Sequence, residues 1–137
     1  VAGFIGSPPM NFFEGRIEQK NGGIWFSEGN FEVRAEDNQA AKLSSRVGQP
    51  VVFGVRPEDV QDVLYVTNAN PDHQVKARVE VVEPMGAEVY IYLNTGKHTF
   101  ISRVDVHDNA DVNQQLTMVL NMKKAHFFDS KSGETII

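Results

Sequence analysis

The chain has 137 residues, of which 41% are hydrophobic, and this is the size and composition of one ordinary domain with a packed core. Eighteen acidic against thirteen basic residues give a net charge of −5, which disfavours a protein that binds nucleic acid regardless of sequence. Cysteine is absent, which excludes disulfides, thiolate metal sites and a cysteine nucleophile, and no apolar run approaches the roughly 20 residues that span a bilayer.

The first segment, residues 1–13, is apolar, carries Gly3 and Gly6, and is broken by Pro8-Pro9. It has neither a starting methionine nor a charged leader, whereas mature N-termini are usually small and polar. We therefore expect a piece of a longer protein that begins close to a domain junction and has a neighbouring domain as its partner.

Alternation of apolar and polar residues predicts strands along most of the chain. Those in chain order are Phe12–Gln19, Ile24–Phe26, Pro50–Val55, Val75–Val81, Ala87–Leu93, Leu116–Met122 and Ala125–Phe128, with Glu134–Ile136 as the last. The inward faces are expected to hold Val75, Ala77, Val79 and Val81, then Val89, Ile91 and Leu93 opposite Tyr90 and Tyr92, and then Leu116, Met118, Leu120 and Met122. Helix is expected only at Asp37–Ser45 and in a turn at Pro57–Val60, where proline opens the turn.

Turn residues separate these strands. Asn21-Gly22-Gly23, Asn94-Thr95-Gly96 and Ser130–Gly133 predict hairpins, because asparagine and glycine tolerate positive φ, and Pro84-Met85-Gly86 separates two strong strands. Many short, evenly spaced strands predict an all-β sandwich or barrel. We expect a single domain over residues 1–137, in which the polar segment Asn68–His73 would divide two halves, 1–67 and 74–137.

No residue pattern predicts a catalytic, cofactor-binding or metal site. Gly96-Lys97 has Ile91 where a phosphate-binding loop needs glycine, and Gly6-Ser7-Pro8 lacks the closing glycine of a nucleophile elbow. The four histidines lack i, i+4 spacing, and Asp105–Asp111 lacks the glycine and distal glutamate of a calcium loop. We expect Asp105–Asp111 to be a polar connection, with Glu80, Glu83 and Glu88 on a solvated face.

Aromatic residues are dense near the start of the chain, at Phe4, Phe12, Phe13, Trp25, Phe26 and Phe31. Rings of this kind stack on bases in barrels that bind single-stranded nucleic acid, but the charges among them are mostly acidic. We expect them to supply the core and an interface for a neighbouring domain.

Four segments together resemble one family. Gly3–Phe12, Gly54-Val55-Arg56-Pro57-Glu58-Asp59, Glu83–Glu88 and His126-Phe127-Phe128-Asp129 are similar, in order and spacing, to the C-terminal regulatory domain of maltose-type ATP-binding-cassette importer ATPases. That domain is also called the transport-associated OB (TOBE) region. The chain departs from the family pattern at Val112–Gln115 and in the loop 105–111.

The resemblance implies an OB-type β-barrel without catalysis or cofactor of its own, with ATP and Mg²⁺ bound in an ATPase domain that precedes it. It implies regulation and dimerisation of a sugar importer's ATP-binding subunit. The implied partners are that ATPase domain, a second copy of the chain, the transporter's membrane subunits and a regulatory protein, at the cytoplasmic face of the membrane. The expected interdomain or dimer interface holds Phe4, Ser7, Pro8, Met10, Asn11, Arg56, Pro57 and Glu58.

Two other functions remain open. A small-ligand or oxyanion-binding OB module would need basic residues to converge, with Arg56, Arg78, Lys97 and Arg103 as candidates. A nucleic-acid-binding OB barrel is the weaker alternative because of the net charge of −5.

Overall fold

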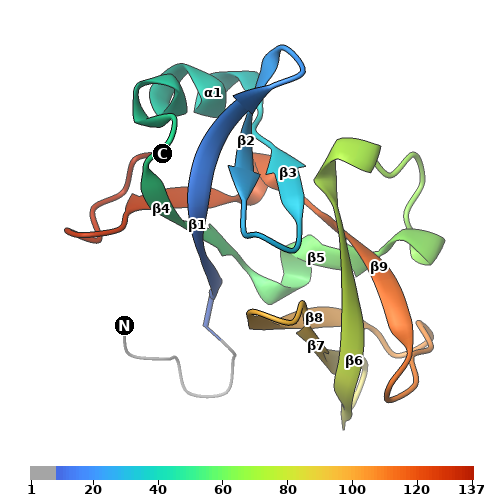
Figure 1. Ribbon diagram of the computed structural model, residues 1–137. Coiled ribbons are helices and arrows are strands. Elements are labelled where there is room, and N and C mark those ends of the chain that lie inside the picture. Colours follow the sequence, from blue (N-terminus) through green and yellow to red (C-terminus); the bar gives the residue numbers. More distant parts are fainter. Residues whose placement is uncertain (1–8) are drawn as a thin grey trace.

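Ten strands form two five-stranded antiparallel sheets in the computed structural model, which describes residues 9–137 (Figure 1). The sheet orders are β10-β4-β1-β2-β3 and β5-β9-β6-β7-β8. The strands are β1 (Asn11–Lys20), β2 (Gly23–Ser27), β3 (Glu32–Arg34), β4 (Pro50–Val55), β5 (Val60–Asp62), β6 (Gln74–Met85), β7 (Glu88–Asn94), β8 (Thr99–Asp105), β9 (Gln115–Leu120) and β10 (His126–Asp129). The expected all-β class is confirmed.

Helical structure among these residues is short. The α-helix α1 (Asp37–Leu43) is followed by a 3₁₀ turn at Ser44–Arg46, and further 3₁₀ turns lie at Pro57–Asp59, Val63–Tyr65, Pro71–His73 and Met122–Lys124. Both expected helical segments are therefore confirmed. The helix α1 begins where Gln39 accepts a hydrogen bond from the backbone N–H of Glu36 at 2.9 Å, as in a capping box. Within the described part of the chain, no helix has the length and apolar character needed to cross a membrane.

The two halves of the chain exchange strands. Strand β5 precedes the polar segment 68–73 but pairs with β9 in the second sheet. Strand β10, near the end of the chain, pairs with β4 in the first sheet. Each half thus completes the sheet that the other half begins, and both share one core.

Side-chain hydrogen bonds bring the edges of the second sheet together. The amide of Gln61 in β5 donates to the carbonyl of Arg103 in β8 at 3.1 Å, and the hydroxyl of Ser102 in β8 donates to the carbonyl of Val60 in β5. Since β5 and β8 are the two outer strands, these bonds nearly close the sheet into the expected OB-type barrel.

The expected hairpins at 21–23 and 94–96 are confirmed. Asn21 and Gly22 have φ values of 51° and 72°, which the favoured two-residue hairpin turn requires, and Lys20 lies opposite Gly23 across it. Gly96, with φ of 102°, lies in the turn between β7 and β8.

The strand β6 departs from the expected alternation. Val75, Ala77 and Val79 point inward and are at most 1% exposed, but Val81 is 48% exposed, so its assignment to the inner face is wrong. The reason is a β-bulge: the register of β6 against β7 shifts between Val79 and Val81, which turns the following side chains over.

The turn after β6 lies later than expected. Strand β6 continues through Pro84 to Met85, where Met85 pairs with Glu88, so the turn consists of Gly86 and Ala87. Gly86 has a φ of 79°, which glycine adopts without strain. Strand β9 likewise ends at Leu120, although Met122 still points into the core as expected.

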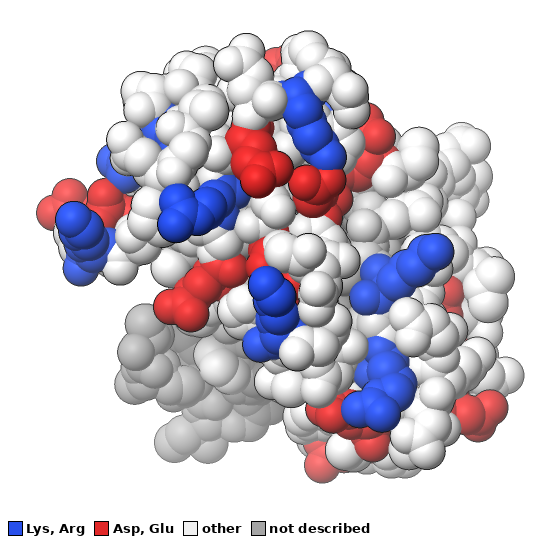
Figure 2. Space-filling model, in the orientation of Figure 1, with Lys and Arg blue, Asp and Glu red and all other residues white. Residues whose placement is uncertain are grey.

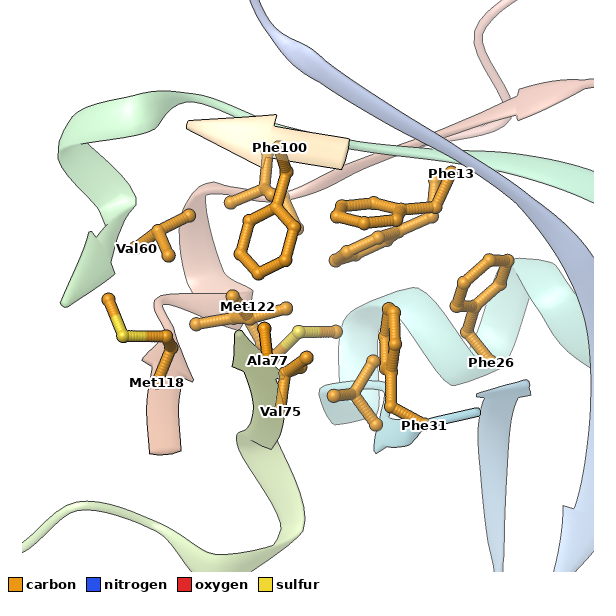
Figure 3. Packing of buried hydrophobic residues seen from close by; sticks show 14 of the residues in the cluster. Phe13, Phe26, Phe31, Val60, Val75, Ala77, Phe100, Met118 and Met122 are labelled. Atoms are coloured by element: carbon orange, nitrogen blue, oxygen red, sulfur yellow. The ribbon is translucent and has the colours of Figure 1, made fainter. Parts of the chain in front are cut away.

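Phenylalanines from both sheets meet in the centre of the core (Figure 3). The ring of Phe13 in β1 lies 5.9 Å from that of Phe53 in β4, 5.2 Å from Phe31 and 5.3 Å from Phe100 in β8, measured between centroids. Because β8 belongs to the second sheet, the Phe13 ring joins the two sheets directly.

Candidate interaction site

The described parts of three of the four motif segments lie side by side, although up to about 115 residues separate them. In the register of β1 against β4, Asn11 lies opposite Val55 and Phe12 opposite Gly54. In the register of β10 against β4, His126 also lies opposite Gly54. Strand β4 therefore brings the start of β1, the Arg56-Pro57-Glu58 corner and the closing hairpin to one place.

Gly54 allows two side chains to cover the outer surface of β4. A Cβ atom at this position would lie 2.4 Å from the sulfur of Met10 and 2.9 Å from the ring of Phe128. The ring of Phe12 lies 5.8 Å from that of Phe128, edge to face, and Phe12 is 41% exposed. We call Met10, Phe12, Gly54 and Phe128 the outer aromatic patch.

Sequence reasoning missed Phe12 and Phe128 as a surface pair. Adjacent residues of a strand point to opposite faces, so Phe12-Phe13 and Phe127-Phe128 each place one ring inside and one outside. That signal is present in the sequence. Which ring of each pair faces the core is decided by how β1 and β10 register on β4.

The predicted interface residue Asn11 is used within the fold. Its side-chain nitrogen donates to the carbonyl of Ile101 at 2.9 Å, and its side-chain oxygen accepts from the Ile101 N–H at 2.8 Å. Asn11 is buried, and this pair of bonds joins the start of β1 to β8 of the other sheet. It thereby fixes the place from which Met10 extends.

The Arg56-Pro57-Glu58 corner presents its two charged residues outward. Pro57 is buried and opens the 3₁₀ turn, while Arg56 and Glu58 on either side of it are exposed. Burial, and to a smaller extent the charge of Glu58, raises the pKa of Asp59 above its usual value. The remaining predicted interface residues, Phe4, Ser7 and Pro8, lie outside the described residues.

Arg103, one of the basic candidates for anion binding, already lies beside two carboxylates. Its guanidinium lies 3.3 Å from a carboxylate oxygen of Glu88 and 3.9 Å from one of Glu58, and its Nε atom has no hydrogen-bond partner among the described residues. Arg78 lies 3.7 Å from Glu80 and is in register with Asn94, at the opposite end of β7 from Arg103. The candidate cations are not all gathered in one place.

Charges on the visible face are mixed. Figure 2 shows Lys and Arg side chains lying among Asp and Glu side chains. Among residues 9–137, no three His, Asp or Glu side chains lie close enough together to hold a metal ion.

A buried hydrogen-bond network, unpredicted from the sequence, links the two sheets at Glu28. One Glu28 carboxylate oxygen lies 2.8 Å from Nδ1 of His98 and accepts from the Thr95 hydroxyl at 2.5 Å, and the other accepts from the Asn30 N–H at 3.0 Å. Nε2 of His98 accepts from the backbone N–H of Glu14 at 3.2 Å. His98 therefore carries its proton on Nδ1 and donates it to Glu28.

Asp129 organises the closing hairpin of the His126–Asp129 motif. Its carboxylate accepts from the backbone N–H groups of Ser132 and Lys131 at 2.8 and 2.9 Å and from Arg46 at 2.7 Å. Gly133, with a φ of 75°, completes the predicted turn, but the expected strand Glu134–Ile136 is reduced to an isolated bridge between Thr135 and Phe128. The Ser132 N–H, then Arg46 and the Lys131 N–H hold the pKa of Asp129 far below its usual range.

We expect Asp129→Asn to destabilise the protein at neutral pH, and the effect to vanish in acid. Because the pKa is lower in the folded than in the unfolded state, the charged form stabilises folding above the unfolded pKa of about 3.9. That stabilisation is lost as the pH falls through the folded pKa. Urea unfolding between pH 7 and pH 3 should show a constant difference from wild type above about pH 5 and a shrinking one below about pH 4. A difference that persists undiminished at pH 3, or an equal effect of Asp111→Asn in an exposed loop, would contradict this.

Comparison with known proteins places this geometry in a family. The model of the MalK OB fold domain matches residues 6–60, and the model of the TOBE domain matches residues 53–128. The oligosaccharides import ATP-binding protein MsmX of Bacillus subtilis is 36% identical over 132 residues, which are 96% of this chain and 36% of that protein. The trehalose/maltose import ATP-binding protein MalK of Thermococcus litoralis is 35% identical over 137 residues, 99% of this chain and 37% of that protein.

The chain thus spans little more than a third of the length of these relatives. Among solved structures, the cytoplasmic molybdate-binding protein ModG, with molybdate bound, superposes with a TM-score of 0.64 at 14% identity. That match covers 85% of this chain and 94% of ModG, and at this identity it shows the fold alone. The match of the TOBE model to more than half of the residues confirms the resemblance inferred from the motifs. The chain belongs to the TOBE domain family, with an N-terminal part of the MalK OB-fold type.

Proposed function

We propose that this chain is the regulatory and dimerisation domain of the ATP-binding subunit of a sugar-type ABC importer, with no catalysis of its own. In that subunit ATP and Mg²⁺ bind to a separate ATPase domain, and the subunit works at the cytoplasmic face of the membrane with its membrane subunits. The support is the likeness, over nearly the whole chain, to proteins named as import ATP-binding proteins for oligosaccharides and for trehalose and maltose.

One structural observation carries the dimerisation role. The outer aromatic patch lies on β1, β4 and β10 beside the exposed charges of Arg56 and Glu58. Exposed aromatic rings together with an arginine are the composition of interface hot spots, which bind through packed rings surrounded by polar contacts. We propose that this surface contacts a second copy of the chain or the ATPase domain.

The physical role is that of a tether. A contact between two regulatory domains keeps two ATPase domains at high effective concentration, so that their closure around ATP becomes intramolecular. A regulatory protein that binds the tether needs only to prefer one arrangement of the pair over another.

The test is the mass of the chain by light scattering over a concentration series. We expect self-association that Phe12→Glu and Arg56→Glu weaken at least about tenfold, because each places a charge or a reversed charge in the contact. Leu64→Glu is the matched control, since Leu64 is 76% exposed and lies in the 3₁₀ turn Val63–Tyr65, away from the patch. Thermal unfolding checks that each variant is folded.

The same preparation is tested for ATP hydrolysis, which we expect to be absent. A chain that remains monomeric at every concentration and also fails to bind its ATPase domain would contradict the proposed role as a tether. If Leu64→Glu weakens self-association as much as Phe12→Glu does, the interface is not at the outer aromatic patch.

A further inference from the structure

A groove with two adjoining cavities runs along the second sheet, apart from the outer aromatic patch. The cavities have volumes of about 290 and 440 Å³ and share Asn70, His73, Leu120 and Asn121. Small-molecule sites usually occupy about 300–1,000 Å³, so this groove has room for a ligand of one or two rings. We call it the β9 groove.

The lining of the β9 groove combines polar and apolar residues. Its polar lining residues include Glu36, Glu58, Asp59, His73, Asn121 and Lys123. The apolar ones are Val66, Ala69, Val119, Leu120 and Met122. Apolar lining residues combined with polar groups are the usual composition of a binding site for a small organic molecule.

Several of the polar groups are free to bind a ligand. Asn121 uses its backbone, which bonds to Asp59 and Lys124, while its side-chain amide has no hydrogen-bond partner among the described residues. The carboxylate of Asp59 is affected by burial and by neighbouring charges only, without a hydrogen bond from the described part of the chain. A ligand with hydroxyl groups would satisfy both.

The charges of the lining residues decide between ligand classes. Three carboxylates, Glu36, Glu58 and Asp59, oppose an anion. A metal ion is disfavoured because no three metal-binding side chains cluster within residues 9–137. An organic cation offers only donors and would leave the asparagine N–H₂ groups and Lys123 without acceptors.

A polyhydroxylated neutral molecule matches all of these groups. Each hydroxyl both donates and accepts, so it pairs with carboxylates, amides and an ammonium alike. His73 is also compatible with a neutral ligand. Burial lowers the pKa of His73, although the Glu36 carboxylate lies 3.7 Å away, so its imidazole is uncharged at neutral pH. The half-buried aliphatic side chains of Val66 and Val119 provide a surface for the C–H face of a sugar ring.

We propose that the β9 groove binds a neutral carbohydrate of one or two rings, held by Asp59 and Asn121. The groove reaches from Glu36, just before α1, to Glu58 at the predicted interface. A bound sugar therefore lies against β5 and β9 of the second sheet and, at Glu58, beside the corner through which the domain is proposed to bind its partner. The proposal itself rests on the groove's chemistry and not on dimerisation.

The test is isothermal calorimetry of the chain with maltose, trehalose and glucose, supported by saturation-transfer NMR of the same sugars. We expect saturable binding of at least one sugar in the millimolar range. Asp59→Asn and Asn121→Ala should each weaken it about tenfold, the usual effect of one lost hydrogen bond to a sugar hydroxyl. Asn109→Ala and Asp111→Asn repeat the same substitutions in an exposed loop and should change binding less than twofold.

Spermidine and sodium phosphate test the other ligand classes. Binding of spermidine or phosphate in place of the sugars would overturn the proposal. So would the absence of a binding signal for all three sugars in both calorimetry and NMR. Sugar binding that Asp59→Asn and Asn121→Ala leave unchanged would place the sugar elsewhere and equally overturn it. If the chain binds sugar but stays monomeric, the proposal for the β9 groove stands and only the dimerisation role is contradicted.

Discussion

Replacing Phe13 by alanine is expected to lower the free energy of unfolding by about 4 kcal/mol. Phe13 is fully buried and contacts rings from both sheets, including Phe53 and Phe100. Its truncation removes the transfer free energy of the ring and leaves a cavity that two separate sheets would have to close together. For a domain with a stability of about 5–15 kcal/mol, that is a large share.

The neighbouring residue provides the control. Phe12 is 41% exposed on the outer face, so Phe12→Ala should cost about 1 kcal/mol, mainly through lost contact with Phe128. Urea unfolding followed by the fluorescence of Trp25 measures both variants, since Trp25 is the single tryptophan. Equal losses for the two variants would show that β1 does not have the register that places Phe13 inside.

Glu28→Ala should destabilise the protein by about 3 kcal/mol at neutral pH. The Glu28 side chain has no exposed surface, and its removal leaves the Nδ1–H of His98 and the backbone N–H of Asn30 without an acceptor. An unsatisfied buried donor costs about 1–3 kcal/mol. Since these groups join the loop after β2 to the β7–β8 turn, the contact between the two sheets should loosen as well.

Two variants separate the network from a general effect of the substitution. Glu28→Gln keeps an oxygen that accepts from His98 and should cost about half as much. Glu32→Ala makes the same change at a partly exposed pair with Lys20 and should cost less than about 1 kcal/mol. Chemical denaturation gives the energies, and the ring proton signals of His98 in NMR report whether its Nδ1–H bond is lost. A Glu28→Ala variant as stable as Glu32→Ala would contradict the network.

Much of the fold was predictable because local rules act alone there. The β1–β2 hairpin follows from Asn21-Gly22, whose positive φ values only a few residue types adopt easily. The strand β4 has the predicted bounds, Pro50–Val55, because an apolar run ends at a proline that opens a turn. Where a bulge intervenes, as before Val81, alternation fails because the pairing with β7 sets the register.

The candidate site was predictable only in part. The motif residues of the Arg56-Pro57-Glu58 corner could be named, since proline and its charged neighbours leave a local pattern. Phe12 and Phe128 could not be separated from Phe13 and Phe127, because only pairing across β4 decides which ring faces outward. The β9 groove and the Glu28 network join residues about 60–85 positions apart and leave no local pattern at all.

The sequence by itself determined the all-β class, the main hairpins and the family, because alternation, turn residues and short motifs are local properties of the chain. Tertiary structure decided that β5 and β10 exchange sheets, that Asn11 bonds to Ile101, and that three distant motifs meet at Gly54. The physical reason is that strand order and register are set by pairing and burial between distant segments. Such contacts depend on the whole core and not on any one stretch of residues.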